Sequence, residues 1–207
     1  MKGFIQKYIL PREVDFNAAF QRQTEATRLT VADLCAYCMH QDIAALVRIE
    51  NDEHGCGEEK SRNMRELLKV FITPYDRESI YRVINQLEWV GLSVKHLALD
   101  LKIYSLDCPQ DSLGILNQLH TMAEELSAGF SCLDKKNITQ VTGIVNSIYA
   151  DYDKAVELCS QANARHLQED ELKHYLAYRE ILLQLKEVAK RIRVTSSTLE
   201  DLVIKSV

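Results

Sequence analysis

The chain has 207 residues, of which 46% are hydrophobic and 27% are charged, and its net charge is -5. This length is enough for a domain with a sizeable core, and the acidic balance gives no electrostatic basis for binding nucleic acid or an anionic membrane. The apolar runs are too short for membrane insertion, and the six dispersed cysteines are typical of a reduced cytoplasmic protein without a secretion signal.

Apolar residues recur with helical spacing along the whole chain, and only seven glycines and three prolines interrupt it. We expect helices over about 13–39, 42–71 and 110–133, with apolar stripes over 80–104, 138–159 and 175–203 marking three more. These stripes alternate in steps of three and four, as helices packed nearly parallel in a bundle require. The prediction is an all-α bundle of six helices, arranged as two three-helix halves.

The second of these helices is interrupted over residues 50–63, ENDEHGCGEEKSRN, where Cys56 is the only apolar side chain. Gly55 and Gly57 each cost a helix interior about 1 kcal/mol relative to alanine. The sequence leaves open whether this stretch is helical or broken at the two glycines. Its charges are expected to form a solvated surface.

Residues 71–81, FITPYDRESIY, contain the signals for a helix start. Thr73 can cap the helix, Pro74 suits the first helical position, and Asp76 follows three residues after the cap. Because a residue before proline avoids the α region, the preceding helix must stop by Thr73. We therefore expect a sharp helical hairpin with almost no loop.

The same stretch closely resembles FITPFDRE(D)IY, the hallmark of the PhoU-like family that accompanies Pit-type inorganic phosphate transporters. Residues 9–11, ILP, lie ahead of a helix as in that family, and residues 202–206, LVIKS, resemble its terminal IVIKN. The resemblance thus covers essentially the whole chain. It implies a single PhoU-like domain, 1–207, with pseudo-repeated halves of about 1–106 and 109–207.

For function, the resemblance implies a non-enzymatic regulator or accessory protein of phosphate transport. Its expected partner is a Pit-type phosphate transporter, which would hold this cytoplasmic protein at the periphery of the inner membrane. We also expect a homo-oligomer, with no nucleic acid bound.

Many PhoU-like proteins bind iron or zinc clusters on acidic motifs, whose carboxylates four residues apart share one helix face. When this chain is aligned on the hallmark, the acidic positions keep only a few candidate ligands, namely Glu53, His54, Glu88, Asp151 and Asp153. In the last helix the corresponding positions include Lys190 and Arg193, which would repel a metal. We therefore expect no cofactor, or at most one weak iron or zinc site.

Two apolar residues take the place of acidic positions in the third helix, Trp89 and Leu92. They lie opposite the apolar stripe, so the helix is apolar on two faces. Either the core is wider there, or the second face binds a partner. We take Trp89 and Leu92 as candidate partner-binding residues.

Two further motifs have simple structural explanations. Cys35 and Cys38 form a CxxC on a helix, where both behave as small hydrophobic residues. Glu171 and His174 form one Glu-x-x-His, whereas a di-iron site needs two copies and two more glutamates. The alternative function is a metal-carboxylate bundle, either an iron- or zinc-binding module or a di-iron enzyme. A purely structural dimer-forming module is a third possibility.

Overall fold

The computed structural model describes residues 14–108, 110–133, 137–168 and 172–206. Over these ranges it contains seven α-helices and one 3₁₀ turn, and no strand. The elements are α2 (Phe16–His40), α3 (Ile43–Glu50), α4 (Cys56–Lys69), α5 (Arg77–Tyr104), η1 (Gln110–Ser112), α6 (Leu113–Ser131), α7 (Ile138–His166) and α8 (Leu172–Ile204). The all-α prediction is confirmed.

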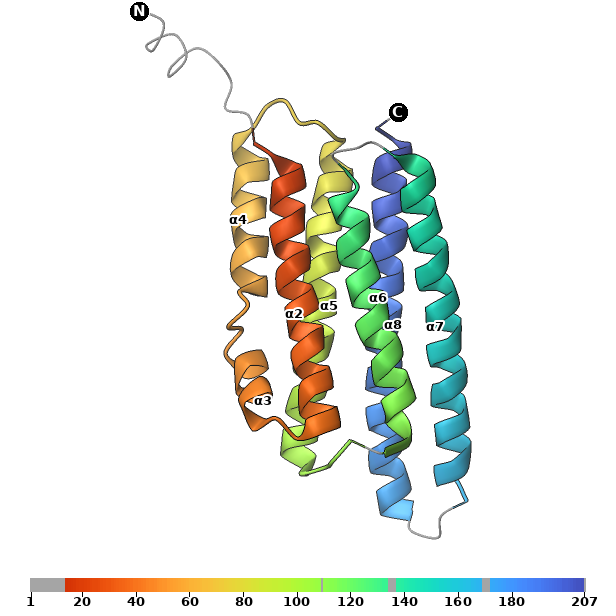
Figure 1. Cartoon of the computed structure of the whole chain (residues 1–207). Helices are drawn as coiled ribbons and strands as arrows, with labels where there is room; N and C mark the ends of the chain where they lie inside the picture. Colours follow the sequence, from red (N-terminus) through yellow and green to blue (C-terminus); the bar gives the residue numbers. More distant parts are fainter. Residues whose placement is uncertain (1–13, 109, 134–136, 169–171, 207) are drawn as a thin grey trace, which may run out of the picture.

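The long helices stand side by side and form an elongated bundle (Figure 1). Helices α5 and α8 lie in its interior, where α5 contacts α2, α3, α4 and α8, and α8 contacts α5, α6 and α7. The predicted stripes face the core: Val83, Leu87, Val90, Val94, Leu97 and Leu101 of α5 are all buried. Tyr104 is the exception, because it lies in the last turn of α5 and is half exposed.

Aromatic and polar contacts tie α2 to α4, α5 and α6 inside this core. The Phe20 ring of α2 lies 6.0 Å from the Phe130 ring of α6. The Gln23 amide donates to the Ile84 carbonyl of α5 over 2.8 Å and accepts from the Asn63 amide of α4 over 2.9 Å. Because these buried polar groups satisfy one another, they fix the register of α2, α4 and α5.

The predicted second helix is in fact two helices, α3 and α4, with a connection over residues 51–55. Asp52 and Gly55 have positive φ angles of 50° and 73°, which end one helix and begin the next. Gly55 supplies this conformation without steric cost. The count of six helices is corrected to seven within the described ranges for this reason.

The expected hairpin at Thr73 is also corrected. Helix α4 ends at Lys69, and α5 begins at Arg77 with Asp76 as its N-cap, whose carboxylate accepts from the Ser79 amide over 3.0 Å. The Arg77 guanidinium turns back and donates to the Val70 and Leu67 carbonyls at the end of α4, each over 2.6 Å. These bonds stabilise a loop over residues 70–76 in place of the tight turn.

In the ranges that the structure describes, no helix has an apolar stretch long enough to cross a lipid bilayer.

Candidate functional site

The candidate site lies at the connection between α3 and α4, where it crosses α2 and α5. Asp52 shapes this connection: its carboxylate accepts from the Cys56 and Gly57 amides, each over 2.9 Å. These are the first amides of α4, whose N-cap residue, Gly55, has no side chain to serve them. Asp52 therefore caps α4 from within the connection.

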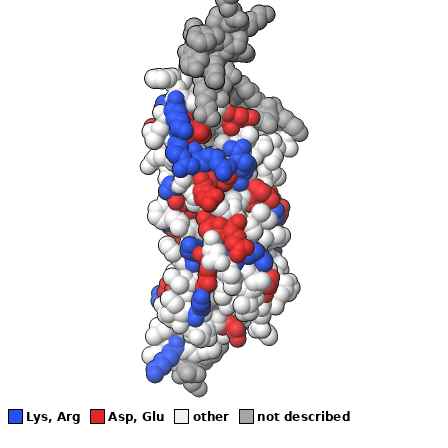
Figure 2. Space-filling model, turned by 90° about the vertical axis from the view of Figure 1, so that its left-hand side faces the viewer, with Lys and Arg blue, Asp and Glu red and all other residues white. Residues whose placement is uncertain are grey.

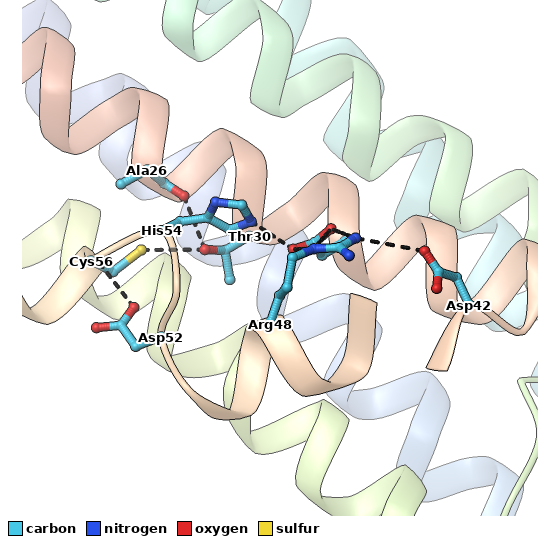
Figure 3. Close-up of polar contacts among 8 residues, drawn as sticks. Ala26, Thr30, Asp42, Arg48, Asp52, His54 and Cys56 are labelled. Atoms are coloured by element: carbon cyan, nitrogen blue, oxygen red, sulfur yellow. Dashed lines mark hydrogen bonds and ion pairs between the residues drawn. The ribbon is translucent and has the colours of Figure 1, made fainter. Parts of the chain in front are cut away.

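Asp33 of α2 holds α3 and the connection against the bundle through Arg48 and His54, which are labelled in Figure 3. Its carboxylate accepts from the Arg48 Nε over 3.1 Å and lies 2.6 Å from the His54 Nε2, and the whole residue is only 7% exposed. Asp42, the N-cap of α3, lies 3.6 Å from the same guanidinium. Burial raises the pKa of Asp33, but the hydrogen bonds from Arg48 and His54 outweigh it and hold this pKa below its usual value.

Beside this cluster is a cavity of about 200 Å³ between α2, the α3–α4 connection and α5. Its lining residues are Thr30, Ile49, Asp52, Cys56, Gly57, Glu88, Gly91, Leu92 and Lys95. The Cys56 thiol lies 3.4 Å from the Thr30 hydroxyl, and burial raises its pKa to about 11. A thiol of this kind stays protonated near neutral pH and is not a nucleophile.

The predicted metal ligands of the first half do not converge. Glu53 is exposed, His54 contacts Asp33, and Glu88 forms an ion pair with Lys60. Across the described ranges, no three side chains of His, Cys, Asp or Glu come together as a possible ligand set for a metal ion.

In the second half, an arginine side chain of α8 lies against α7, the helix on which Asp151 and Asp153 were predicted as candidate metal ligands. The Arg193 guanidinium of α8 lies over two rings of α7, 4.6 Å from the centre of Tyr149 and 5.2 Å from that of Tyr152. Asp153 is exposed. Asp151 is half-buried. Burial raises the pKa of Glu125 on α6, and the charge of Asp151 adds to this effect.

The two candidate partner-binding residues lie on different sides of α5. Trp89 is 44% exposed, and its ring lies 4.9 Å beneath the Arg191 guanidinium of α8. Leu92 is half-buried and lines the cavity at the α3–α4 connection. The structure thus places Leu92 with Glu88, and it places Trp89 beside α8.

Sequence reasoning missed Asp33, whose signal was a single carboxylate among the apolar positions of α2. It also missed an apolar tip formed by three side chains at the end of α4 and in the loop after it. Leu68, Phe71 and Ile72 are 77%, 94% and 74% exposed. Phe71 and Ile72 belong to the hallmark stretch, which was interpreted through its capping signals and its family resemblance and not through its apolar side chains. Glu171 of the Glu-x-x-His motif and the ILP segment lie outside the described residues.

The face that carries α3 and α4 is strongly charged (Figure 2). Acidic side chains run along its middle, and Lys and Arg gather toward one end. Many of these charges neutralise one another, since Glu59 pairs with Arg62 and Arg22, and Glu66 with Lys69. Ion pairs at a protein surface contribute little to stability.

Comparison with solved structures defines the class of this fold as a PhoU-like helical bundle. A PhoU-like protein from Shewanella oneidensis MR-1 superposes with a TM-score of 0.75 at 13% identity, over 91% of this chain and 97% of that one. A putative PhoU-like phosphate regulatory protein from the same organism gives the same score and identity over 91% and 96%. PhoU from Streptococcus pneumoniae, a phosphate transport system regulatory protein, gives 0.63 at 16% identity over 90% and 92%.

In sequence, the chain is similar to the UPF0111 protein YkaA of Bacillus subtilis (strain 168). The two are 23% identical over 147 residues, which are 69% of this chain and 71% of that protein. No family model matches the sequence. At these identities the comparisons establish the fold.

Proposed function

We propose that this protein is a non-enzymatic regulator or accessory protein of inorganic phosphate transport. The PhoU-like bundle carries the proposal, because the solved structures that share it include a phosphate transport system regulatory protein. The hallmark stretch at residues 71–81 supports the finer assignment to a Pit-type transporter as partner. In this role the protein is cytoplasmic and reaches the inner membrane through the transporter.

The apolar tip, Leu68, Phe71 and Ile72, is the surface best suited to this contact. Side chains of this size leave water when a partner covers them, and each contributes about 1.5–3 kcal/mol when fully buried. The loop that carries the tip is held in place, because the Arg77 guanidinium donates to the Leu67 and Val70 carbonyls. A fixed apolar surface binds at a smaller entropic cost than a flexible one. Trp89 offers a second surface, suited to contact between two copies of the chain.

The proposed mechanism uses protein contacts without a metal cluster. The Asp33 carboxylate already accepts from Arg48 and contacts His54, and Glu88 is neutralised by Lys60. In the second half Arg193 brings a positive charge to the surface of α7. Binding a cation at Asp33 or Glu88 would require breaking existing ion pairs, and a cation at α7 would be repelled by Arg193. Stoichiometric iron or zinc in protein purified without chelators would contradict this part of the proposal and favour the metal-carboxylate bundle.

The partner assignment is tested by co-purification with a Pit-type phosphate transporter from co-expressing membranes. We expect the transporter to be captured by the wild-type chain, and capture to fall about tenfold or more when Phe71 and Ile72 are both changed to glutamate. Leu176→Glu is the matched control, because Leu176 is 52% exposed near the start of α8, at the opposite end of the bundle (Figure 1). No capture by the wild-type chain, or equal capture by all variants, would reject the proposal.

A further inference from the structure

Two of the six cysteines differ from the others in exposure and lie together. Cys35, Cys56, Cys132 and Cys159 are buried, whereas Cys38 and Cys108 are partly exposed. These two thiols line the same cavity of about 210 Å³, with Tyr37, Gln41, Ile43 and Asp107. The two most exposed thiols are therefore neighbours, although they are far apart in the sequence.

The ends of two helices bring them together. Helix α2 ends at His40, where Gln41 adopts a φ of 54° and donates its amide to the Tyr37 carbonyl over 2.8 Å. Helix α5 ends at Tyr104, where Ser105 adopts a φ of 52° and the Leu106 amide donates to the Leu101 carbonyl over 3.0 Å. Both ends lie at the same end of the bundle (Figure 1), so the chain that leaves α5 passes the last turn of α2.

Both thiols line one cavity, which places them close together. The proximity of Cys108, followed by burial, raises the pKa of Cys38. Cys35, one turn earlier, is different: burial raises its pKa to about 12, and its thiol donates to the Leu116 carbonyl over 3.4 Å. The Cys35 thiol is thus hydrogen-bonded within the core. The pair considered for oxidation is therefore Cys38 with Cys108, and not Cys35 with Cys38 of the CxxC.

We propose that Cys38 and Cys108 form a site of reversible oxidation, in which a peroxide converts the two thiols into an intramolecular disulfide. The Cys108 sulfur attacks one oxygen of hydrogen peroxide, the O–O bond breaks, and the thiol proton goes to the departing oxygen, giving a sulfenic acid and water. The Cys38 sulfur then attacks the Cys108 sulfur, an S–S bond forms, and a second water leaves. In sum, two thiols and one peroxide give one disulfide and two waters.

Oxidation begins at Cys108, because Cys38 is the thiol whose ionisation is disfavoured. The sulfur of the Cys108 sulfenic acid is an electrophile, and the neighbouring Cys38 attacks it as its own proton leaves with the departing water. Once formed, the bond ties the end of α2 to the α5–α6 connection, which joins the two halves of the bundle. A thiol reductant restores both cysteines.

The test counts maleimide-reactive thiols in the folded full chain before and after treatment with hydrogen peroxide. We expect the two partly exposed thiols to react before the four buried ones, both to be lost after peroxide, and both to return with dithiothreitol. Peptide mapping of the oxidised wild-type chain should find residues 38 and 108 in one cross-linked pair, with the loss of two hydrogen atoms. This measurement needs no variant and does not depend on how a substitution affects folding.

Variants complete the test. Cys38→Ser and Cys108→Ser should each abolish the intramolecular disulfide, whereas Cys159→Ser, at a buried thiol elsewhere, should leave it unchanged. A cross-link between Cys35 and either thiol, a disulfide between two chains through Cys108, or oxidation of Cys108 to a sulfinic acid in the wild-type chain would each overturn the proposal.

Discussion

The guanidinium of Arg191 on α8 lies over the indole of Trp89 on α5, 4.9 Å from the centre of the ring. This contact joins the two interior helices at the protein surface, where Trp89 is 44% exposed. It gives Trp89 a structural role within one chain in addition to the contact surface that we propose for it.

The strength of this contact can be measured by a double-mutant cycle in urea. Trp89→Ala and Arg191→Met remove the ring and the charge separately, while methionine keeps most of the aliphatic packing of Arg191. We expect a coupling free energy of about 0.5–1 kcal/mol, as for exposed cation–π pairs. A coupling near zero would show that the stacking is incidental. Light scattering of Trp89→Ala measures association separately. An oligomer that stays intact in this variant would show that association does not depend on this surface.

Removing the carboxylate of Asp33 should loosen the α3–α4 region. Asp33→Asn takes away the charged acceptor of Arg48 and His54, and we expect the free energy of unfolding to fall by about 2 kcal/mol. Chemical denaturation measures this change. Glu53→Gln is the matched control, because Glu53 is an exposed acid in the same connection, and it should change stability by less than about 0.5 kcal/mol. Equal effects of the two variants would contradict the assigned role of Asp33.

The Asp33 carboxylate makes the free energy of unfolding depend on pH. Because the pKa of folded Asp33 is lowered, the unfolded chain binds its proton first as the pH falls. The contribution is fully present above the unfolded pKa of about 4 and is lost as the pH falls through the folded pKa. Thermal melts of the wild-type chain between pH 6 and about pH 3 should therefore converge on those of Asp33→Asn. A constant difference between the two melting temperatures would argue against this linkage.

Two glycines in helices should respond oppositely to alanine. Nothing lies within 4 Å of a Cβ built on Gly143 of α7, so Gly143→Ala should stabilise the chain by about 0.5–1 kcal/mol. A Cβ on Gly129 of α6 would lie 2.8 Å from a methyl carbon of Leu199 on α8, so Gly129→Ala forces that buried side chain to move. We expect this substitution to destabilise the chain by about 1–3 kcal/mol. Matched urea titrations distinguish the two, and stabilisation by both would mean that α6 and α8 are less closely packed than described.

Asp52 should matter for the start of α4. Asp52→Ala removes the acceptor of the Cys56 and Gly57 amides and places a side chain without hydrogen-bonding capacity at a positive φ. We expect a loss of about 1–2 kcal/mol, and a smaller loss for Asp52→Asn, which accepts one bond and tolerates this conformation. Hydrogen exchange at residues 56 and 57 should accelerate in the alanine variant. Unchanged exchange there would contradict the capping role.

The helical stripes could be predicted because their information is local. Val83, Leu87 and Val94 repeat at helical spacing, and a helix with this pattern buries that side in any bundle. The cap of α5 could not be chosen in the same way. Thr73 and Asp76 are both good N-cap residues, and the choice is made by Arg77, which reaches back to α4 after the chain has folded.

The candidate site depends on contacts between distant residues, which explains why little of it was predicted. The sequence drew attention to His54, Glu88 and Leu92, and the structure places these around the α3–α4 connection. Asp33 was missed because its partners follow fifteen and twenty-one residues later, too far for a local pattern to connect them. Likewise, Cys108 carried no motif, and its relation to Cys38 arises only where two helix ends meet.

Helix α3 has only eight residues, fewer than an isolated helix needs to persist in water. Helix α3 therefore stays folded only through the contact of Arg48 with Asp33 and through the packing of Ala45, Leu46 and Ile49 against the core. Residues 43–55 form a unit that can unfold while the long helices remain intact. A partner that competes for Arg48 or His54 could release this unit without disturbing the rest of the bundle.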